Sequence, residues 1–475
     1  MGKNNLMALF VFIFFELGLQ KTLIMRLIFL FILCATVTNL FGQTPPQTDS
    51  RHYDIISAVS AERIEHDIRT LADFGTRHTL SDTLSQTRGI GAARRWIRDQ
   101  FEDISKNCDN CLEVIYQRNL QKGNPDTRIK TDTEIVNVIA IQRGTVYPNR
   151  YVIMSGDIDS RVSDVLNFTD DSPGANDNAS GMAGTIETAR VLSKYKFPTS
   201  IIYVGLSGEE QGLFGGKFLA EYAKENGWNI VGVLNNDMIS NIQGLDGVIE
   251  NNTFRVFSEP TPVTENEAER RRRRFYGGEV DGVSRQLARY VARMTDTYFT
   301  NLKAIMIYRL DRFGRGGHHR PFNDAGFPGV RIMETHENYN RQHQDLREEN
   351  GIKYGDVMEG VNPDYAAKLT GVNAITLAGL AWAPPQPVHV KIGGAVQPST
   401  TLAWDNQNDP NLAGYKIYWR ETTEAQWKYS RFVARGNNSF TLEGIVIDNY
   451  LFGVAAVGKD GNESVVAFPE DIIRK

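Results

Sequence analysis

Cysteine is scarce in this sequence, with 3 residues in a chain of 475. So few cysteines exclude a small scaffold built on many disulfides. An excess of one charge sign is also missing: 52 basic residues oppose 57 acidic ones, and the net charge of −5 argues against a nucleic-acid partner. No long apolar run follows the N-terminal region, which excludes a polytopic membrane protein. The composition, 41% hydrophobic and 23% charged, is that of two or three globular domains.

The first 43 residues differ from the rest because they hold two apolar runs, at residues 7–15 and 27–37. The second run follows Met25 and one arginine directly, and the small residue Gly42 comes after it, as in a secretory signal peptide. We therefore expect a signal peptide region at residues 1–43, a true start at Met25, and a secreted or periplasmic protein without membrane contact after signal removal. A single anchoring helix is the alternative.

Export changes how the cysteines are interpreted, because Cys34 would leave with the signal peptide. Cys108 and Cys111 remain, separated by two residues. In an oxidising compartment we expect these two to form a small, loop-closing disulfide. A redox-active pair is the alternative, although no strand and helix of thioredoxin type surround it.

Helical and strand-like patterns alternate between residues 53 and 382. Short apolar runs rich in β-branched residues indicate strands that are buried on both faces. Their alternation with amphipathic helices predicts an α/β fold with a doubly wound, mostly parallel sheet flanked by helices. The predicted helices are residues 61–74, 90–101, 181–195 and 363–382, and the predicted strands include residues 135–142, 151–155 and 200–206.

The end of the chain has a different pattern. A proline-rich linker at residues 384–387 precedes short alternating runs separated by turn signals, which predict a small all-β sandwich at residues 386–475. This segment resembles a fibronectin type III module, with Trp404 in its core. Such modules usually serve as spacers or binding units, so we expect this one to bind another protein or a glycan and to carry no chemistry.

Acidic residues recur at the ends of predicted strands and before a predicted helix. Each one alone is more typical of a helix cap, a turn or a surface pair. In an open parallel sheet, however, the carboxyl ends of strands line the ligand crevice, so the set could converge. Converging carboxylates need a cation against their mutual repulsion, and a mixture of oxygen and nitrogen ligands favours zinc. The set consists of Asp157, Asp159, Asp177, Glu209, Glu210 and Asp237, followed by His343.

The adjacent pair Glu209 and Glu210 suits hydrolysis at a metal. In an extended segment, neighbouring side chains point to opposite sides, so one glutamate could bind the metal while the other faces the substrate. A free glutamate beside a metal-bound water is the general base that such hydrolysis requires.

The motifs GANDNASG, SGEEQGLFGG and NND occur in this order and are followed by HHRPFNDAGFPGV and a late histidine. With these motifs, the region from about residue 55 to residue 380 resembles the co-catalytic zinc aminopeptidases, which are related to glutamate carboxypeptidase and glutaminyl cyclase. The resemblance implies a zinc peptidase-like α/β domain at residues 52–383, peptide substrates, and zinc as the cofactor.

Carried over by position, the resemblance assigns roles to the acidic set. Asp177 would bridge two zinc ions, Glu210 and His343 would complete one site, Asp237 would belong to the other, and Glu209 would be the base.

The resemblance also bears on three neighbouring residues. The bond between Asp177 and Asn178 would be cis. His319 would line the substrate pocket, and Asp159 would support the site from behind the ligands.

One position departs from the family pattern. The family has His-x-Asp-Ser where this chain has Asp157-Ile158-Asp159-Ser160, so Asp157 stands in place of a histidine ligand. Three outcomes follow: Asp157 still binds zinc, the second site prefers a harder ion such as manganese or magnesium, or that site is empty and one zinc remains. With the extra carboxylate, the site would also acidify its water less.

These observations predict an exported metal-dependent exopeptidase, most specifically an aminopeptidase that uses a metal-bound water and Glu209. The alternatives are a glutaminyl cyclase or a carboxypeptidase on the same scaffold, or a non-catalytic binding protein that lost its histidine at Asp157. Five consecutive arginines at residues 270–274 fit a solvated loop or helix start, or else recognition of an acidic substrate or partner.

Overall fold

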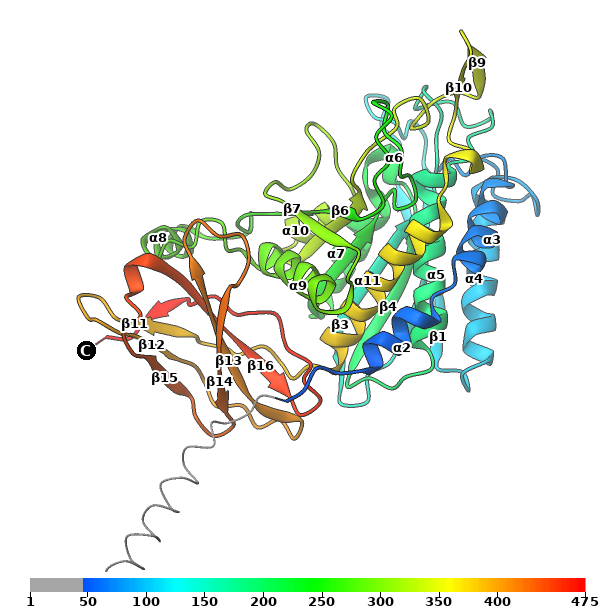
Figure 1. The fold of residues 1–475 in the computed structure, drawn as a ribbon. Helices are drawn as coiled ribbons and strands as arrows, with labels where there is room; N and C mark the ends of the chain where they lie inside the picture. Colours follow the sequence, from blue (N-terminus) through cyan, green and yellow to red (C-terminus); the bar gives the residue numbers. More distant parts are fainter. Residues whose placement is uncertain (1–45, 475) are drawn as a thin grey trace, which may run out of the picture. The chain divides into compact units, whose positions relative to one another are not determined.

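A computed structural model describes residues 46–474 of the chain, and an eight-stranded sheet lies at its centre (Figure 1). The strands are β1 (Leu112–Gln121), β2 (Thr133–Gln142), β3 (Tyr147–Asp157), β4 (Thr199–Leu206), β5 (Asn229–Asn236), β6 (Thr253–Ser258), β7 (Lys303–Ile307) and β8 (Gly329–Glu334). Their order across the sheet is β1-β2-β4-β3-β5-β8-β6-β7. Strands β4, β3, β5 and β8 are parallel, and β1, β2 and β6 add antiparallel pairings.

Helices cover both faces of this sheet (Figure 1), which confirms the predicted fold class. One face packs against α3 (Ala61–Ala72), α4 (Gly89–Lys106), α5 (Gly181–Leu192), α9 (Val283–Tyr298) and α11 (Pro363–Trp382), with α2 (Arg51–Ala58) against α11. The other face packs against α7 (Phe214–Glu225) and α10 (His319–Asp324). Alternate residues of β3 serve the two layers, since Val152 and Met154 belong to the first core and Tyr151 and Ile153 to the second.

The predicted elements are present with shifted ends. Helix α11 begins where Asn362 accepts a hydrogen bond from the backbone N–H of Tyr365, as its Asn-Pro start indicates. The weakly patterned region 243–279 contains β6 and helix α8 (Glu267–Phe275), which carries the five arginines on a surface without buried residues. Two of these arginines pair with Glu267 on the same helix, so the solvated helix is the interpretation that the structure supports.

The C-terminal strands form two small sheets that share one core. The strands are β11 (Lys391–Gly393), β12 (Thr400–Ala403), β13 (Leu412–Glu421), β14 (Tyr429–Ala434), β15 (Ser439–Leu442), β16 (Tyr450–Gly458) and β17 (Asp471–Ile472). One sheet has the order β15-β12-β11-β17 and the other β14-β13-β16. Trp404 is buried in the shared core, with its ring centroid 4.9 Å from that of Tyr415.

A buried charge cluster joins the second sheet to helix α9. Asp281, just before the helix, lies 2.6 Å from the guanidinium of Arg289 and 2.8 Å from that of Arg420 on β13. All three side chains are almost fully buried, and the carbonyl of Ala425 accepts a further hydrogen bond from Arg289. The two arginines share the one carboxylate, so its charge is essential to them.

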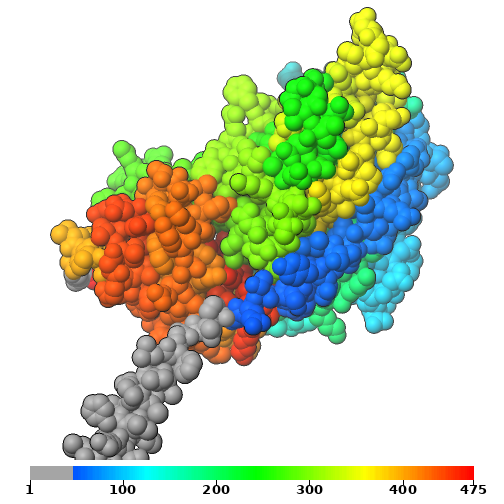
Figure 2. Space-filling model, in the orientation of Figure 1, coloured from blue at the N-terminus to red at the C-terminus, as the bar shows by residue number. Residues whose placement is uncertain are grey.

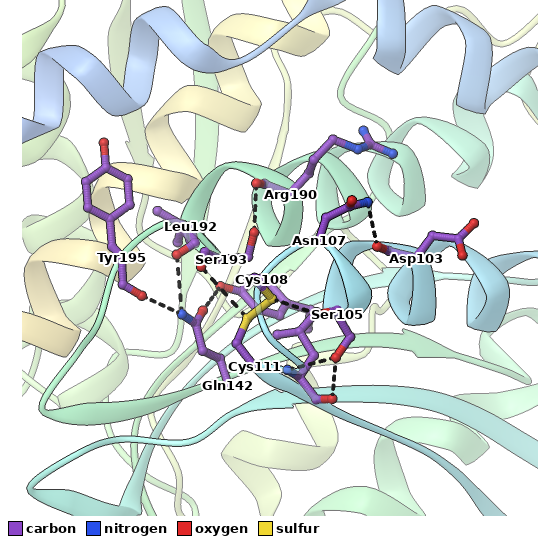
Figure 3. The surroundings of a disulfide bond; sticks show 12 residues. Asp103, Ser105, Asn107, Cys108, Cys111, Gln142, Arg190, Leu192, Ser193 and Tyr195 are labelled. Atoms are coloured by element: carbon purple, nitrogen blue, oxygen red, sulfur yellow. Dashed lines mark hydrogen bonds between the residues drawn. A yellow bond between two sulfur atoms is a disulfide. The ribbon is translucent and has the colours of Figure 1, made fainter.

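The predicted disulfide between Cys108 and Cys111 is present (Figure 3). It closes the turn between the end of α4 and the start of β1, and Ser105 accepts a hydrogen bond from the N–H of Leu112 across the same turn. The expected signal peptide, the start at Met25 and Cys34 lie outside the described residues. Within residues 46–474, no helix combines the length and the apolar character that a membrane span requires.

Candidate metal centre

Three side chains meet beyond the carboxyl ends of the central strands. The Nε2 atom of His343 lies 3.0 Å from Oδ2 of Asp177 and 2.8 Å from Oε1 of Glu210. Within the described part of the chain, this is the one group of three metal-ligating residues whose ligand atoms all lie within 4.8 Å of one another. Neighbouring ligands of a tetrahedral zinc lie about 3.3 Å apart when the bonds are about 2.0–2.1 Å long, so two carboxylates and an imidazole fit this ion after small outward shifts.

The backbone holds two members of this group, Asp177 and His343, in unusual conformations. Asp177 lies in an irregular turn (Ala175–Ser180), where the expected cis bond to Asn178 is present. His343 has a φ of 55°, a left-handed conformation that a non-glycine residue adopts only when its surroundings enforce it. The β9–β10 hairpin (Arg347–Glu349 and Ile352–Tyr354) follows His343 in the chain and stands out from the surface in yellow (Figure 2).

Two buried aspartates fix the loops that carry the ligands. Asp356 accepts hydrogen bonds from the backbone N–H groups of Asn176, at 2.9 Å, and Asp177, at 2.6 Å. Asp159 accepts hydrogen bonds from the N–H groups of Glu209, at 3.2 Å, and Glu210, at 3.0 Å. The ligand positions are therefore set by charge-assisted bonds to backbone as well as by packing.

The side chains of Glu209 and Glu210 point in different directions, as expected, but the expected extended backbone is wrong. They begin a short helix, α6 (Glu209–Gly212), which follows Gly208 in the left-handed region with a φ of 77°. Successive residues on a helix point about 100° apart, and this rotation turns Glu210 toward His343. Within residues 46–474, nothing donates a hydrogen bond to the partly exposed carboxylate of Glu209, which leaves it free to accept a proton.

Charged neighbours control the protonation of this group. Burial alone would lower the pKa of His343, but the carboxylates of Glu210 and Asp177 raise it to about 9. Burial likewise opposes ionisation of Asp177 and Glu210, yet the adjacent imidazole holds both pKa values below their usual range. Burial, and then the neighbouring Glu210, raise the pKa of Glu209 well above that of an ordinary glutamate.

Two arginines flank the imidazole on its other side. Arg161 donates to Oε2 of Glu210 at 2.7 Å, and its Nη2 lies 2.6 Å from Nδ1 of His343. Nη2 of Arg315 lies 3.4 Å from the same nitrogen. A metal on Nε2 needs the imidazole proton at Nδ1, so Arg161 must turn away from Nδ1 when a metal binds.

The two remaining expected ligands do not join the group. Asp157 is buried, and its Oδ1 lies 2.5 Å from Nδ1 of His318. Asp237 is also buried, and its Oδ2 lies 2.8 Å from the guanidinium of Arg331. Both oxygens of Asp157 and Oδ2 of Asp237 are therefore already paired with protein groups, whereas Oδ1 of Asp237 has no hydrogen-bond partner within residues 46–474.

His319 also lies away from the group. Its side chain is fully buried, and Nε2 lies within hydrogen-bond distance of the carbonyl of Leu310, at 2.8 Å. A role of His319 in the substrate pocket stays a prediction.

Comparison with known sequences identifies the family. A profile described as "Peptidase family M28" matches residues 137–357. A protein of Pyrenophora tritici-repentis described as a probable zinc metalloprotease is 40% identical over 428 residues, which are 90% of this chain and 87% of that protein. The chain belongs to peptidase family M28. As an M28 peptidase it is a zinc-dependent metallopeptidase, which confirms the predicted enzyme class and cofactor.

Further relatives of this M28 peptidase cover similar lengths. A probable zinc metalloprotease of Pyrenophora teres f. teres is 40% identical over 90% of this chain and 88% of that protein. Among solved structures, LapB from Legionella pneumophila is 15% identical, with a TM-score of 0.49, and the match covers 70% of this chain and 76% of LapB.

Sequence reasoning missed two residues of this M28 peptidase that lie against the expected ligands. Arg331 is a buried charge in the middle of strand β8, whose other charged residue is Glu334 at its end, and such a residue needs a buried partner, so the signal was present. His318 precedes the histidine that the family pattern singles out, and its contact with Asp157 across 161 positions has no local signal.

Proposed function

We propose that this M28 peptidase is an exported zinc exopeptidase, and specifically an aminopeptidase. The observation that supports this most strongly is the meeting of Asp177, Glu210 and His343. Glu209 directly precedes Glu210 in the chain, and its carboxylate accepts no hydrogen bond within residues 46–474. A metal site and a free base at one sheet edge are the two components that metal-assisted peptide hydrolysis requires.

In this proposal Asp177, Glu210 and His343 hold the zinc. When bound, the zinc supplies Lewis acidity toward a peptide carbonyl and toward water. Glu209 takes the proton of the attacking water and passes it to the leaving amine. Asp159 keeps the backbone of Glu209 in place through the bond to its N–H group, so the base holds its direction during the transfer.

A panel of blocked and unblocked substrates tests the proposal. Aminoacyl-anilides with a free amine should be cleaved, and the same anilides after N-acetylation should not. Cyclisation of peptides with N-terminal Gln, in place of hydrolysis, would identify a glutaminyl cyclase. Absence of turnover across the panel with added zinc, manganese or cobalt would instead indicate a binding protein.

A carboxypeptidase is the second candidate, and the arginines beside His343 are the observation that favours it. The guanidiniums of Arg161 and Arg315 both reach Nδ1 of this histidine, where they could bind a terminal carboxylate. Cleavage of N-acetyl dipeptides with a free carboxylate, but not of their C-terminal amides, would select this alternative. The arginines at residues 270–274 give no support to it, because they lie on the exposed helix α8.

The domain assignments and the location of the enzyme belong to the same proposal. The peptidase domain comprises residues 52–383, the fibronectin type III-like module comprises residues 386–475, and residues 1–43 direct export. The Cys108–Cys111 disulfide supports an oxidising location, and the shared core of the two C-terminal sheets supports the sandwich. The module would bind another protein or a glycan. N-terminal sequencing of the mature protein tests the export signal.

A further inference from the structure

At the second metal position of this peptidase, both oxygens of Asp157 and one oxygen of Asp237 are paired with protein groups, and Arg331 supplies positive charge there. We infer that the chain binds a single zinc, at Asp177, Glu210 and His343, and that the buried guanidinium of Arg331 replaces the second ion. This inference rests on the zinc site of the proposed function. It specifies in addition that one metal ion is bound and that Arg331 takes the place of the second.

Buried polar partners fix the guanidinium of Arg331 beside Asp237. The arginine side chain is fully buried on β8, with one guanidinium nitrogen 2.8 Å from Oδ2 of Asp237 and another 3.2 Å from Oδ1 of Asp311. The carbonyl of Gly316 accepts a hydrogen bond from Arg331 at 2.9 Å. A buried arginine keeps its charge and needs such partners, so it is fixed in this place.

The loop around the guanidinium is shaped for it. A Cβ atom on Gly317 would lie 3.2 Å from Nη1 of Arg331 and 2.9 Å from Oδ1 of Asn235, closer than most Cβ contacts. The absence of a side chain at Gly317 therefore leaves the room that the guanidinium occupies. Arg331 has a prepared site and is not an accidental neighbour of Asp237.

Charge repulsion follows from this geometry. A divalent ion bound to Oδ2 of Asp237 at about 2.1 Å would lie within about 5 Å of the Arg331 nitrogen, since that nitrogen is 2.8 Å from the oxygen. Two positive charges at that distance in a buried site repel each other strongly. Arg331 is fully buried and cannot turn away as the partly exposed Arg161 can, so the ion and the arginine exclude each other at Oδ2 of Asp237. Oδ1 of Asp237 has no hydrogen-bond partner within residues 46–474.

The other expected ligand of the second ion is also occupied. Oδ1 of Asp157 lies 2.5 Å from Nδ1 of His318, and Oδ2 accepts a hydrogen bond from the side chain of Asn178 at 2.7 Å. His318 does not replace the missing histidine ligand. A Cβ on Gly216 of α7 would lie 2.7 Å from Cδ2 and 3.3 Å from Cγ of His318, so this edge of the ring packs against the helix. Nε2 of His318 has no hydrogen-bond partner within residues 46–474, but it belongs to no group of three metal-ligating residues there.

Metal content of the purified full chain is the first test. Protein saturated with zinc and then freed of loose metal should retain one zinc per chain by plasma mass spectrometry. Two per chain would overturn the inference and leave the proposed function standing. One zinc per chain without hydrolysis of any peptide would support the one-zinc inference and contradict the proposed peptidase function. Absence of bound zinc would contradict both.

Two matched variants locate the bound ion. Asp237→Asn should retain one zinc, because Asp237 is paired with Arg331 and is not a ligand. Asp177→Asn should lose at least roughly tenfold in zinc affinity, as expected for loss of a carboxylate ligand. A fall in the zinc content of Asp237→Asn would contradict the inference.

Arg331→Met should increase the number of divalent ions that the protein binds. Removal of the guanidinium frees the carboxylate of Asp237, so titration with manganese should reveal a second divalent ion that the wild type does not take up. An Arg331→Met protein that is folded and still binds one ion would count against Arg331 as the substitute. If this variant does not fold, the zinc contents of the wild type and of Asp237→Asn decide the question alone.

Discussion

Nδ1 of His318 lies 2.5 Å from Oδ1 of Asp157, although 161 positions separate the two residues in the chain. Asp157 stands where the family resemblance places a histidine ligand, so this contact puts an imidazole beside that position from a different segment. The imidazole binds Oδ1 of the aspartate and Asn178 donates to Oδ2, so both oxygens of Asp157 are occupied. The contact between His318 and Asp157 and the pairing of Asp237 with Arg331 distinguish the position of a second ion from the candidate zinc site. At the second position, protein groups already bind the expected ligands.

Replacement of Glu209 by glutamine should separate catalysis from metal binding. The variant is expected to retain its zinc, because Glu209 is not in the ligand group, and to lose at least roughly a hundredfold in kcat, because an amide cannot accept the proton. Glu210→Gln is the control and should lose zinc. Metal content and initial rates check both, and retained activity in Glu209→Gln would remove it from the role of base.

Zinc binding to the metal-free protein should release a proton. Without metal, His343 is protonated below its pKa of about 9, which the carboxylates of Glu210 and Asp177 raise against the effect of burial. Zinc requires the neutral imidazole, so apparent affinity should rise about tenfold per pH unit between pH 7 and pH 9 and then level off. Calorimetry in buffers of different ionisation enthalpy measures this proton, and observed binding heats that do not change with the buffer would contradict the prediction.

Asp356→Ala should weaken zinc binding although Asp356 is not a ligand. Its carboxylate accepts the backbone N–H groups of Asn176 and Asp177, and loss of these bonds frees the turn that positions the Asp177 ligand. We expect zinc affinity to fall about 10–100-fold, as for other residues that orient metal ligands. The matched control is Asp364→Ala, an exposed residue at the start of α11, which should leave the affinity unchanged in a competition assay with a chelator.

Asp281→Asn should destabilise the fold without touching the metal centre. The change removes the one negative charge between the buried guanidiniums of Arg289 and Arg420 and keeps the shape of the side chain. Loss of one partner from such a cluster costs about 3–5 kcal/mol. Urea unfolding followed by tryptophan fluorescence measures this loss. The exposed Asp448→Asn serves as the control, and equal stability of the two variants would show that the cluster contributes little.

Periodicity and motif order were sufficient for the architecture. The apolar runs of β2, β3 and β4 and the Asn-Pro start of α11 were predicted because each depends on neighbours in the chain. In region 243–279, strand β6 was not predicted and helix α8 only as one of two options at the five arginines. Strand β6 is short and α8 has no apolar face, so neither element has a strong local pattern.

The strand-end positions of the acidic motifs predicted that the set could converge, and the family resemblance implied that Asp177, Glu210 and His343 share one metal. Strand ends of a parallel sheet lie at one edge, and that rule applies to any sequence with this pattern. The helical start at Glu209 was not predicted, because it depends on the left-handed Gly208 and not on the glutamates themselves.

By itself, the sequence determined the layers of the fold through local pattern, and the disulfide through the spacing of its cysteines and the expected export. Its motifs also carried the family resemblance that implied the three candidate ligands. Only the tertiary structure decided which protein groups pair with the neighbouring carboxylates of Asp157 and Asp237. Arg331 reaches Asp237, and His318 reaches Asp157, from segments far away in the chain. Such pairings depend on which strands become neighbours and on the room that Gly317 leaves, and no local pattern contains that information.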